Sequence, residues 1–268
     1  MRALCEIMKQ HKSIMIKEFL KKNLTTSSKR KLRNFIDDIR AIGLGINLDK
    51  LGKIYRTDKI GTHYYTPNYK LHLKKMKFRR INLLEIGVGG YENPNDGGNS
   101  LRMWKKYFPF GKIFSLDIYD KTALQEKRIK IFQGSQIDSD FLDKVTNEIG
   151  RIDIIIDDGS HINEHVIETF RLLFPKLNDG GIYIIEDTQT SYWSDYGGDS
   201  ENLNNPKTMM TFFKSLIDSL NNKEFVIANY KQSYYDKKIV SMHFYHNLIF
   251  IYKGNNDEES NFVFNNQR

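Results

Sequence analysis

The sequence predicts an α/β fold with a mostly parallel sheet, antiparallel strands at the C-terminal end and an N-terminal helical extension. From Ile81 onward, short continuous apolar runs alternate with helical stretches, the pattern of buried parallel strands covered by helices on both faces. Near the end, residues 224–230 and 239–254 are strand-like with no helix between them. Antiparallel strands need only a turn, whereas parallel strands need a long crossover, so an antiparallel finish is expected.

The order of elements follows from the same periodicities. Residues 1–48 are expected to form the helical extension, with a Ser/Lys break at Thr25–Lys31; residues 49–254 form the main domain and 255–268 a polar tail. A helix is expected after Pro67. Strands are expected at 81–88, 112–120, 129–135, 152–158 and 181–187. Helices are expected at 99–108, 141–150, 162–177 and 208–222.

Charge and composition exclude several classes of protein. Residues 1–80 carry 21 Lys+Arg and 6 Asp+Glu (+15) and the remainder 20 and 27 (−7), which sums to the net +8. The basic segment fits a lysine-rich solvated surface, with nucleic acid, anionic lipid or phosphorylated substrates as alternatives. One cysteine excludes an intrachain disulfide and a Cys-based zinc site. No apolar run is long enough for a membrane span, so we expect a cytoplasmic protein without stable membrane insertion.

A glycine-rich turn follows the first strand of the main domain. "LLEIGVGG" ends in Gly87 and Gly89, and glycine at such a turn lets a ligand approach the backbone. Asp117, at the tip of the next strand, is placed to bind both hydroxyls of a ribose. The third glycine of the dinucleotide fingerprint is replaced by Glu92. We therefore predict S-adenosylmethionine as cofactor, aided by the nearby carboxylate of Glu85, with NAD or no cofactor as alternatives.

Two further strands each end in adjacent carboxylates. "RIDIIIDDGSH" ends in Asp157 and Asp158, and "GGIYIIEDTQT" carries Glu186 and Asp187. Neighbouring strands lie about 4.8 Å apart, so these groups are within reach of one shared ion. Oxygen ligands favour Mg²⁺, Mn²⁺ or Ca²⁺. The alternative is that the acids cap the following helices.

His161 follows the first carboxylate pair by three residues. A neutral histidine beside a carboxylate cluster suits a general base, although a structural histidine is the alternative. A metal pair with His165, four residues on, is conceivable. The parts together predict methyl transfer to a sugar hydroxyl: a divalent ion lowers the pKa of the hydroxyl and His161 takes its proton.

The chain resembles the metal-dependent, S-adenosylmethionine-dependent sugar O-methyltransferases that act on macrolides and tetracenomycin-type polyketides, with relatives in surface-polysaccharide clusters. The resemblance spans roughly Leu51 to Gly254 and rests on motifs such as "TDKIGTHYYTPNY", "LLEIGVGG", "NSLRMWKKYFP", "IDDGSHINEHVIETFRLLFPKLNDGGIYIIEDTQTSYW" and "SMHFYHNLIFIYKG". It implies a class I methyltransferase (Rossmann-like) fold. The loop "YENPNDGGNS" and the first 45 residues depart from the family pattern.

The resemblance also implies roles for particular residues. Asp158, Glu186 and Asp187 would hold Mg²⁺ (or Mn²⁺), and His161 would be the general base. Tyr192 and Trp193 would contact the acceptor. The residues implied in cofactor binding are Tyr65, Glu85, Gly87, Gly89, Asp117, Gln136, Asp138 and Asp157.

The expected acceptor is a small-molecule sugar, nucleotide-linked or a precursor of a surface polysaccharide, and a homo-oligomer is expected. Two other functions stay open at this point. One is N-methylation of a small or phosphorylated amine, which needs less activation by a metal. The other is nucleic-acid binding through the basic first 80 residues, although no aromatic-basic RNA motif supports it and no nucleic-acid partner is expected.

Overall fold

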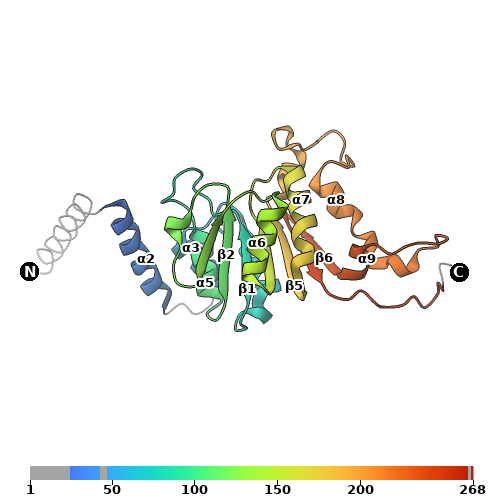
Figure 1. The fold of residues 1–268 in the computed structure, drawn as a ribbon, viewed down its shortest axis with the longest axis horizontal. Coiled ribbons are helices and arrows are strands. Elements are labelled where there is room, and N and C mark those ends of the chain that lie inside the picture. Colours follow the sequence, from blue (N-terminus) through green and yellow to red (C-terminus); the bar gives the residue numbers. More distant parts are fainter. Residues whose placement is uncertain (1–24, 43–46, 265–266, 268) are drawn as a thin grey trace, which may run out of the picture.

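The computed structural model describes residues 25–42, 47–264 and 267, and its centre is one seven-stranded sheet (Figure 1). The strand order is β3-β2-β1-β4-β5-β7-β6. The first five strands pair in parallel, and β7 is antiparallel to both β5 and β6. The mixed sheet predicted from the sequence is therefore confirmed. Its strands are β1 (Asn82–Ile86), β2 (Lys112–Asp117), β3 (Ile129–Gln133), β4 (Ile152–Asp157), β5 (Leu177–Glu186), β6 (Ile239–Tyr245) and β7 (Leu248–Lys253).

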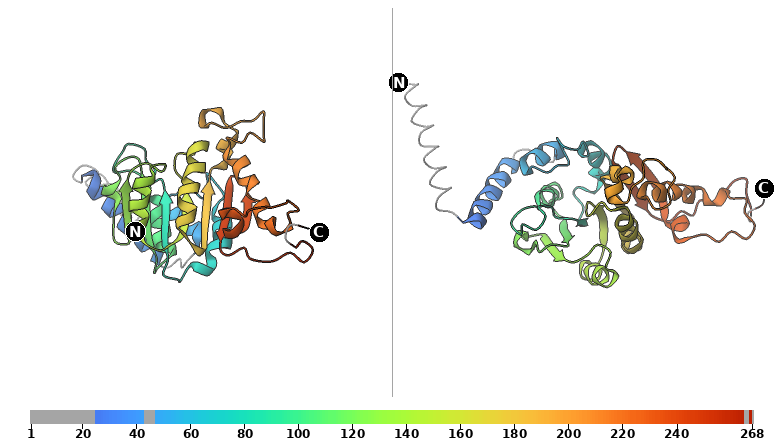
Figure 2. Two further views of the ribbon diagram at one scale, coloured as in Figure 1. Left: turned by 45° about the vertical axis from the view of Figure 1, so that its right-hand side comes forward. Right: turned by 90° about the horizontal axis from the view of Figure 1, so that it is seen from above.

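Helices cover both faces of this sheet, as continuous apolar strands require (Figure 2). One face packs against α3 (Leu48–Tyr55), α4 (Thr66–Leu73) and α5 (Asn99–Tyr107), with Trp104 fully buried among them. The other face packs against α6 (Ser139–Ile149), α7 (Asn163–Leu173) and α8 (Met209–Ser215), with Phe170 at its centre. Each helix contributes an apolar stripe, so the two cores are separated only by the sheet.

Glycines and short 3₁₀ segments complete the connections between these elements. The 3₁₀ segments are η1 (Lys74–Met76), η2 (Thr122–Leu124), η3 (Phe174–Lys176), η4 (Thr188–Tyr192), η5 (Ser194–Tyr196) and η6 (Asp218–Glu224). A short helix, α9 (Tyr234–Lys238), begins at a Ser233–Asp236 capping box and leads into β6. In the described part of the chain, no helix has both the length and the apolar character needed to cross a membrane.

The structure corrects three expectations about the elements. Helix α2 (Thr26–Ile42) begins inside the segment predicted as a break, and α3, capped by Asn47, was not separately expected. Residues 224–230 form no strand: Val226 and Ile227 are exposed, and β6 already occupies that edge of the sheet. Residues 1–24 of the expected helical extension lie outside the described residues.

Candidate functional site

The tips of three adjacent strands bring the predicted acids together. Strand β4 lies between β1 and β5, with Asp157 opposite Ile86 of β1 and Ile185 of β5. Glu85, Asp158 and Glu186 therefore converge at the carboxyl-terminal edge of the sheet. Ligands bind at this edge in open α/β sheets. The sheet order thus accounts for why carboxylates distant in sequence share one place.

The glycine turn after β1 borders the same edge. Gly87 has a positive φ of 92°, and a Cβ there would lie 2.2 Å from the backbone oxygen of Asp158, so only glycine fits. A Cβ on Gly89 would instead meet open space. Asp117 accepts hydrogen bonds from the backbone amides of Val88 (2.8 Å) and Tyr119 (3.0 Å). Asp117 is thereby held beside the turn, where the sequence predicts a ribose.

The outer part of the acidic edge consists of Asp158, His161 and Asp187. One ligand atom of each lies within 4.8 Å of the others. His161 Nε2 is 3.9 Å from Asp158 Oδ1 and 3.7 Å from Asp187 Oδ2. His161 and Asp187 both have positive φ (57° and 53°), a conformation rarely adopted by residues other than glycine. Such backbone strain is concentrated at functional sites.

Asp187 receives further support from the segment before the first strand. Tyr65 donates a hydrogen bond of 2.6 Å to Asp187 Oδ1, and His63 Nε2 lies 3.6 Å from the same atom. The His63 and Tyr65 rings are stacked at 4.7 Å. Burial opposes ionisation of Asp187, but the Tyr65 hydrogen bond and the nearby His161 and His63 outweigh it and lower its pKa. Asp187 is therefore ionised at neutral pH.

The inner part of the acidic edge is arranged around Lys59. Its Nζ lies 2.7 Å from Asp158 Oδ2, 2.6 Å from Glu186 Oε1 and 3.3 Å from Glu85 Oε1. Tyr69 also donates a short hydrogen bond to Glu186 Oε1. Lys59, Glu85 and Tyr69 are fully buried, and Glu186 is nearly so. Burial alone would lower the pKa of Lys59, but the three carboxylates hold it well above its ordinary value.

Burial raises the pKa values of Glu85, Asp158 and Glu186, and it raises that of Glu85 to about 7. For Asp158 and Glu186 the rise due to burial is opposed by Lys59. A further cation would favour their ionised forms. The two outer carboxylates, which are accessible from solvent, suit a hard divalent ion such as Mg²⁺ or Mn²⁺, and His161 lies beside them. Glu186 lies beside this group but is not part of it, so its role as a metal ligand stays a prediction.

Asp157 faces the opposite side of the strand from Asp158, as strand geometry requires. Its oxygens lie 3.5 Å from Tyr183 Oη and from Gln136 Nε2, and burial raises its pKa to about 7. Gln136 also binds Thr169 and the backbone amide of Ser160. Gln136 and Asp157 therefore support the loop that carries Asp158.

Asp138 and Tyr65 have contacts that the sequence did not indicate. Asp138 is exposed and caps α6 by accepting a hydrogen bond from the Phe141 amide, so it has a structural role besides the predicted cofactor binding. Tyr65, predicted at the cofactor site, lies against Asp187 on the metal side. Tyr192 and Trp193 follow β5, in η4 and just after it, and both side chains are exposed, 39% and 51%.

Sequence reasoning missed Lys59 and the contribution of His63. Both belong to "TDKIGTHYYTPNY", a motif of the family resemblance in which Tyr65 was given a role but Lys59 and His63 were not. A buried lysine cannot be distinguished from a surface lysine by spacing alone. The only available signal was that this lysine lies in a segment rich in tyrosine and histidine, ten residues before Tyr69.

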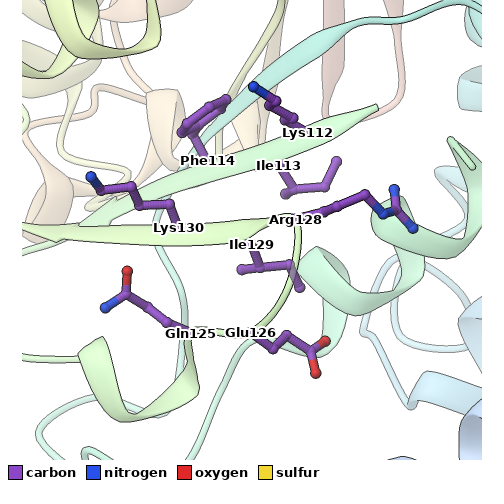
Figure 3. Close-up of a pocket in the computed structure, with 8 residues that line it drawn as sticks. All are labelled: Lys112, Ile113, Phe114, Gln125, Glu126, Arg128, Ile129 and Lys130. Atoms are coloured by element: carbon purple, nitrogen blue, oxygen red, sulfur yellow. The ribbon is translucent and has the colours of Figure 1, made fainter. Parts of the chain in front are cut away.

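A cavity of about 560 Å³ lies at the opposite edge of the sheet (Figure 3). It is lined by the beginnings of β2 and β3, including Lys112 and Ile129. Two of its charged groups are already engaged: Arg128 donates to three backbone carbonyls, and Glu126 pairs with Arg102 and Lys105. This cavity is therefore separate from the acidic edge and carries no comparable chemistry.

Comparison with known proteins identifies the class. No protein-family model matches the chain. Over 214 residues it is 45% identical to mycinamicin VI 2''-O-methyltransferase of Micromonospora griseorubida and 44% identical to demethylmacrocin O-methyltransferase of Streptomyces fradiae. Each alignment covers 79% of this chain and 54% of the relative. The chain thus spans about half the length of these relatives.

A solved structure agrees with this match. The MycE methyltransferase of the mycinamycin biosynthetic pathway, in complex with Mg and SAH, superposes with a TM-score of 0.78 at 45% identity, over 80% of this chain and 56% of that chain. The fold is that of a class I methyltransferase. The chain belongs to the family of macrolide and tetracenomycin sugar O-methyltransferases. The resemblance read from the motifs is therefore confirmed.

Proposed function

We propose that this chain transfers a methyl group from S-adenosylmethionine to a sugar hydroxyl with the help of Mg²⁺ or Mn²⁺. The proposal rests on one observation. Asp158, His161 and Asp187 lie close enough together to surround a single metal ion, and they share a sheet edge with the glycine turn and Asp117. A relative 45% identical is described in complex with Mg and SAH, the methyl donor after transfer. The chain aligns with only about half the length of these relatives, so the activity of the whole protein is also part of this proposal.

The carboxyl-terminal edge of the sheet has two sides, one that would bind the cofactor and one that would bind the metal ion. Gly87 lets the turn pack against the backbone of Asp158, Gly89 leaves open space for a close ligand, and Asp117 offers carboxylate oxygens to a ribose. Asp158 and Asp187, with Glu186 behind them, offer oxygens to a divalent ion. Such an ion supplies positive charge that lowers the pKa of the acceptor hydroxyl. The two sides meet at Asp158, whose backbone contacts the glycine turn.

His161 is the proposed general base. Its Nε2 lies between the two outer carboxylates, so a hydroxyl bound there is within reach of the imidazole. As the hydroxyl oxygen forms a bond to the methyl carbon, the carbon–sulfur bond breaks and its electron pair remains on sulfur. The hydroxyl proton passes to His161 Nε2. The neighbouring carboxylates stabilise the imidazolium that results.

The acceptor is proposed as a sugar in small-molecule form. The relatives are named for mycinamicin VI, demethylmacrocin and a rhamnosyl tetracenomycin. More narrowly, we propose a nucleotide-linked sugar or a surface-polysaccharide precursor as the acceptor, because the basic first 80 residues would suit a phosphorylated molecule. Tyr192 and Trp193 follow the metal-binding acids at the end of β5 in sequence, and their exposed rings suit stacking on a sugar ring. A homo-oligomer is proposed on the family resemblance.

The test is methyl transfer measured by mass spectrometry on a panel of glycosylated macrolides and nucleotide sugars. We expect a gain of one methyl group in one member, abolished by EDTA and restored by Mg²⁺. His161→Gln should lower the rate by about 10²–10⁴-fold while Mn²⁺ binding persists. Undiminished transfer in EDTA would overturn the metal role and would favour an amine acceptor, which needs less activation. Activity retained by His161→Gln would overturn the base assignment.

A further inference from the structure

The carboxylates in the inner half of the acidic edge are paired with a lysine side chain, that of Lys59. Lys59 is fully buried and contacts the inner oxygens of Asp158 and Glu186 within 2.7 Å, with Glu85 at 3.3 Å. Across residues 25–42, 47–264 and 267, no other lysine or arginine pairs with these three carboxylates. Glu85 and Glu186 are buried and Asp158 is partly so, and three such carboxylates without a cation would be strongly unfavourable in this fold.

The two oxygens of Asp158 divide the inner half from the outer half. Oδ2 faces Lys59 at 2.7 Å, whereas Oδ1 faces His161 Nε2 at 3.9 Å on the more accessible side. Glu186 Oε1 is taken by Lys59 and Tyr69. Lys59 therefore holds one oxygen of Asp158 and leaves the other for the outer group.

We propose that Lys59 is a fixed internal cation that partly neutralises the inner carboxylates, so that the fold does not depend on a divalent ion and the ion is confined to the outer oxygens. Lys59 is then a positioning residue: it acts on the substrate only through Asp158 and Glu186. The inference rests on the proposed function, because it assumes that the outer oxygens bind a divalent ion.

The variant Lys59→Met tests this idea, because it keeps the length of the side chain and removes the charge. The matched control is Lys253→Met: Lys253 is also buried, but its Nζ contacts backbone carbonyls of Phe174, Pro175 and Leu177 instead of carboxylates. Melting temperatures are measured for both variants and the native sequence, after EDTA treatment and with millimolar Mn²⁺. Mn²⁺ binding is followed by electron paramagnetic resonance.

We expect both variants to melt lower without metal, but only Lys59→Met to become metal-dependent. Its gain in melting temperature on adding Mn²⁺ should be at least about twice that of the native sequence, because the ion then also neutralises the inner carboxylates. Lys253→Met should gain as much as the native sequence. An equal gain in all three would overturn the inference and leave the proposed function intact. Absence of Mn²⁺ binding by the native sequence would instead remove the proposed metal site.

A second variant covers the case in which Lys59→Met does not fold. Lys59→Met combined with Glu85→Gln removes one of the charges that Lys59 balances. We expect this double variant to give more folded protein than Lys59→Met alone, and Mn²⁺ during refolding to increase the yield of Lys59→Met. If neither Mn²⁺ nor Glu85→Gln improves the yield, Lys59 acts by packing and the inference fails.

Discussion

Strands β4 and β5 end in the same sequence pattern, two adjacent carboxylates, but the structure gives the two pairs different surroundings. Asp157, the first acid of β4, meets the uncharged Tyr183 and Gln136. Glu186, the first acid of β5, meets Lys59 and Tyr69. The difference arises because the segment carrying Lys59 and Tyr69 packs on one face of the sheet only. A carboxylate at a strand tip therefore takes its role from the face that it occupies.

The second acids of the two strands behave alike. Asp158 and Asp187 are both partly accessible, and both lie within reach of His161. These two residues, one after each strand, form the outer group together with His161, whereas Asp157 and Glu186 point into the protein. The comparison thus predicts strong functional effects at the outer acids and weaker or different effects at Asp157.

The largest effect is expected for Asp187→Asn. The amide keeps the shape but removes the charge that would help to hold a divalent ion, so the methyl-transfer rate should fall by at least about 100-fold. The measurement is kcat/KM at saturating S-adenosylmethionine with Mg²⁺. The control is Asp195→Asn, an exposed acid eight residues later, which should leave the rate unchanged. A rate for Asp187→Asn within about threefold of the native value would show that the outer group is not the reaction site.

A smaller and different effect is expected for Asp157→Asn. Because Asp157 faces Tyr183 and Gln136, its loss should leave Mn²⁺ affinity within about threefold of the native value. Asp158→Asn should weaken that affinity by about tenfold or more. Titration of Mn²⁺ into each variant makes the comparison. Equal weakening in both variants would contradict the separation of the two acids by face.

The smallest effect is expected in a buried cluster without carboxylates. His72 of α4 forms hydrogen bonds with Tyr252 (2.7 Å) and Tyr245 (2.8 Å), and its ring lies beside that of His243. Burial, together with the nearby His243, lowers the pKa of His72 to about 4. Between pH 6.5 and 4 the unfolded chain binds a proton that the folded chain does not, so stability should fall as pH decreases through this window, by about 1–3 kcal/mol.

Urea unfolding at a series of pH values measures this dependence. His72→Phe should flatten the slope between pH 6.5 and 4, while the exposed His246→Gln should not change it. An unchanged slope in His72→Phe would assign the acid sensitivity to other groups.

Much of the fold could be predicted from sequence because its signals are local. Apolar runs of strand length, helical stripes and the glycine turn each depend on neighbouring residues, and β1 to β5 appear where these signals lie. Residues 224–230 were predicted wrongly because a short apolar run does not reveal whether a sheet edge is free to pair with it. Helix α3 was missed because its eight residues are short and lie among loop signals.

By itself, the sequence determined the order of the elements and the presence of paired carboxylates at two strand tips, since both follow from residues adjacent in the chain. Tertiary structure alone decided which acids share a cation. Lys59 is about a hundred residues from Asp158 and further still from Glu186, yet sheet order and helix packing place them within 2.7 Å. Burial then makes that contact consequential, because charges removed from water must be balanced by a partner.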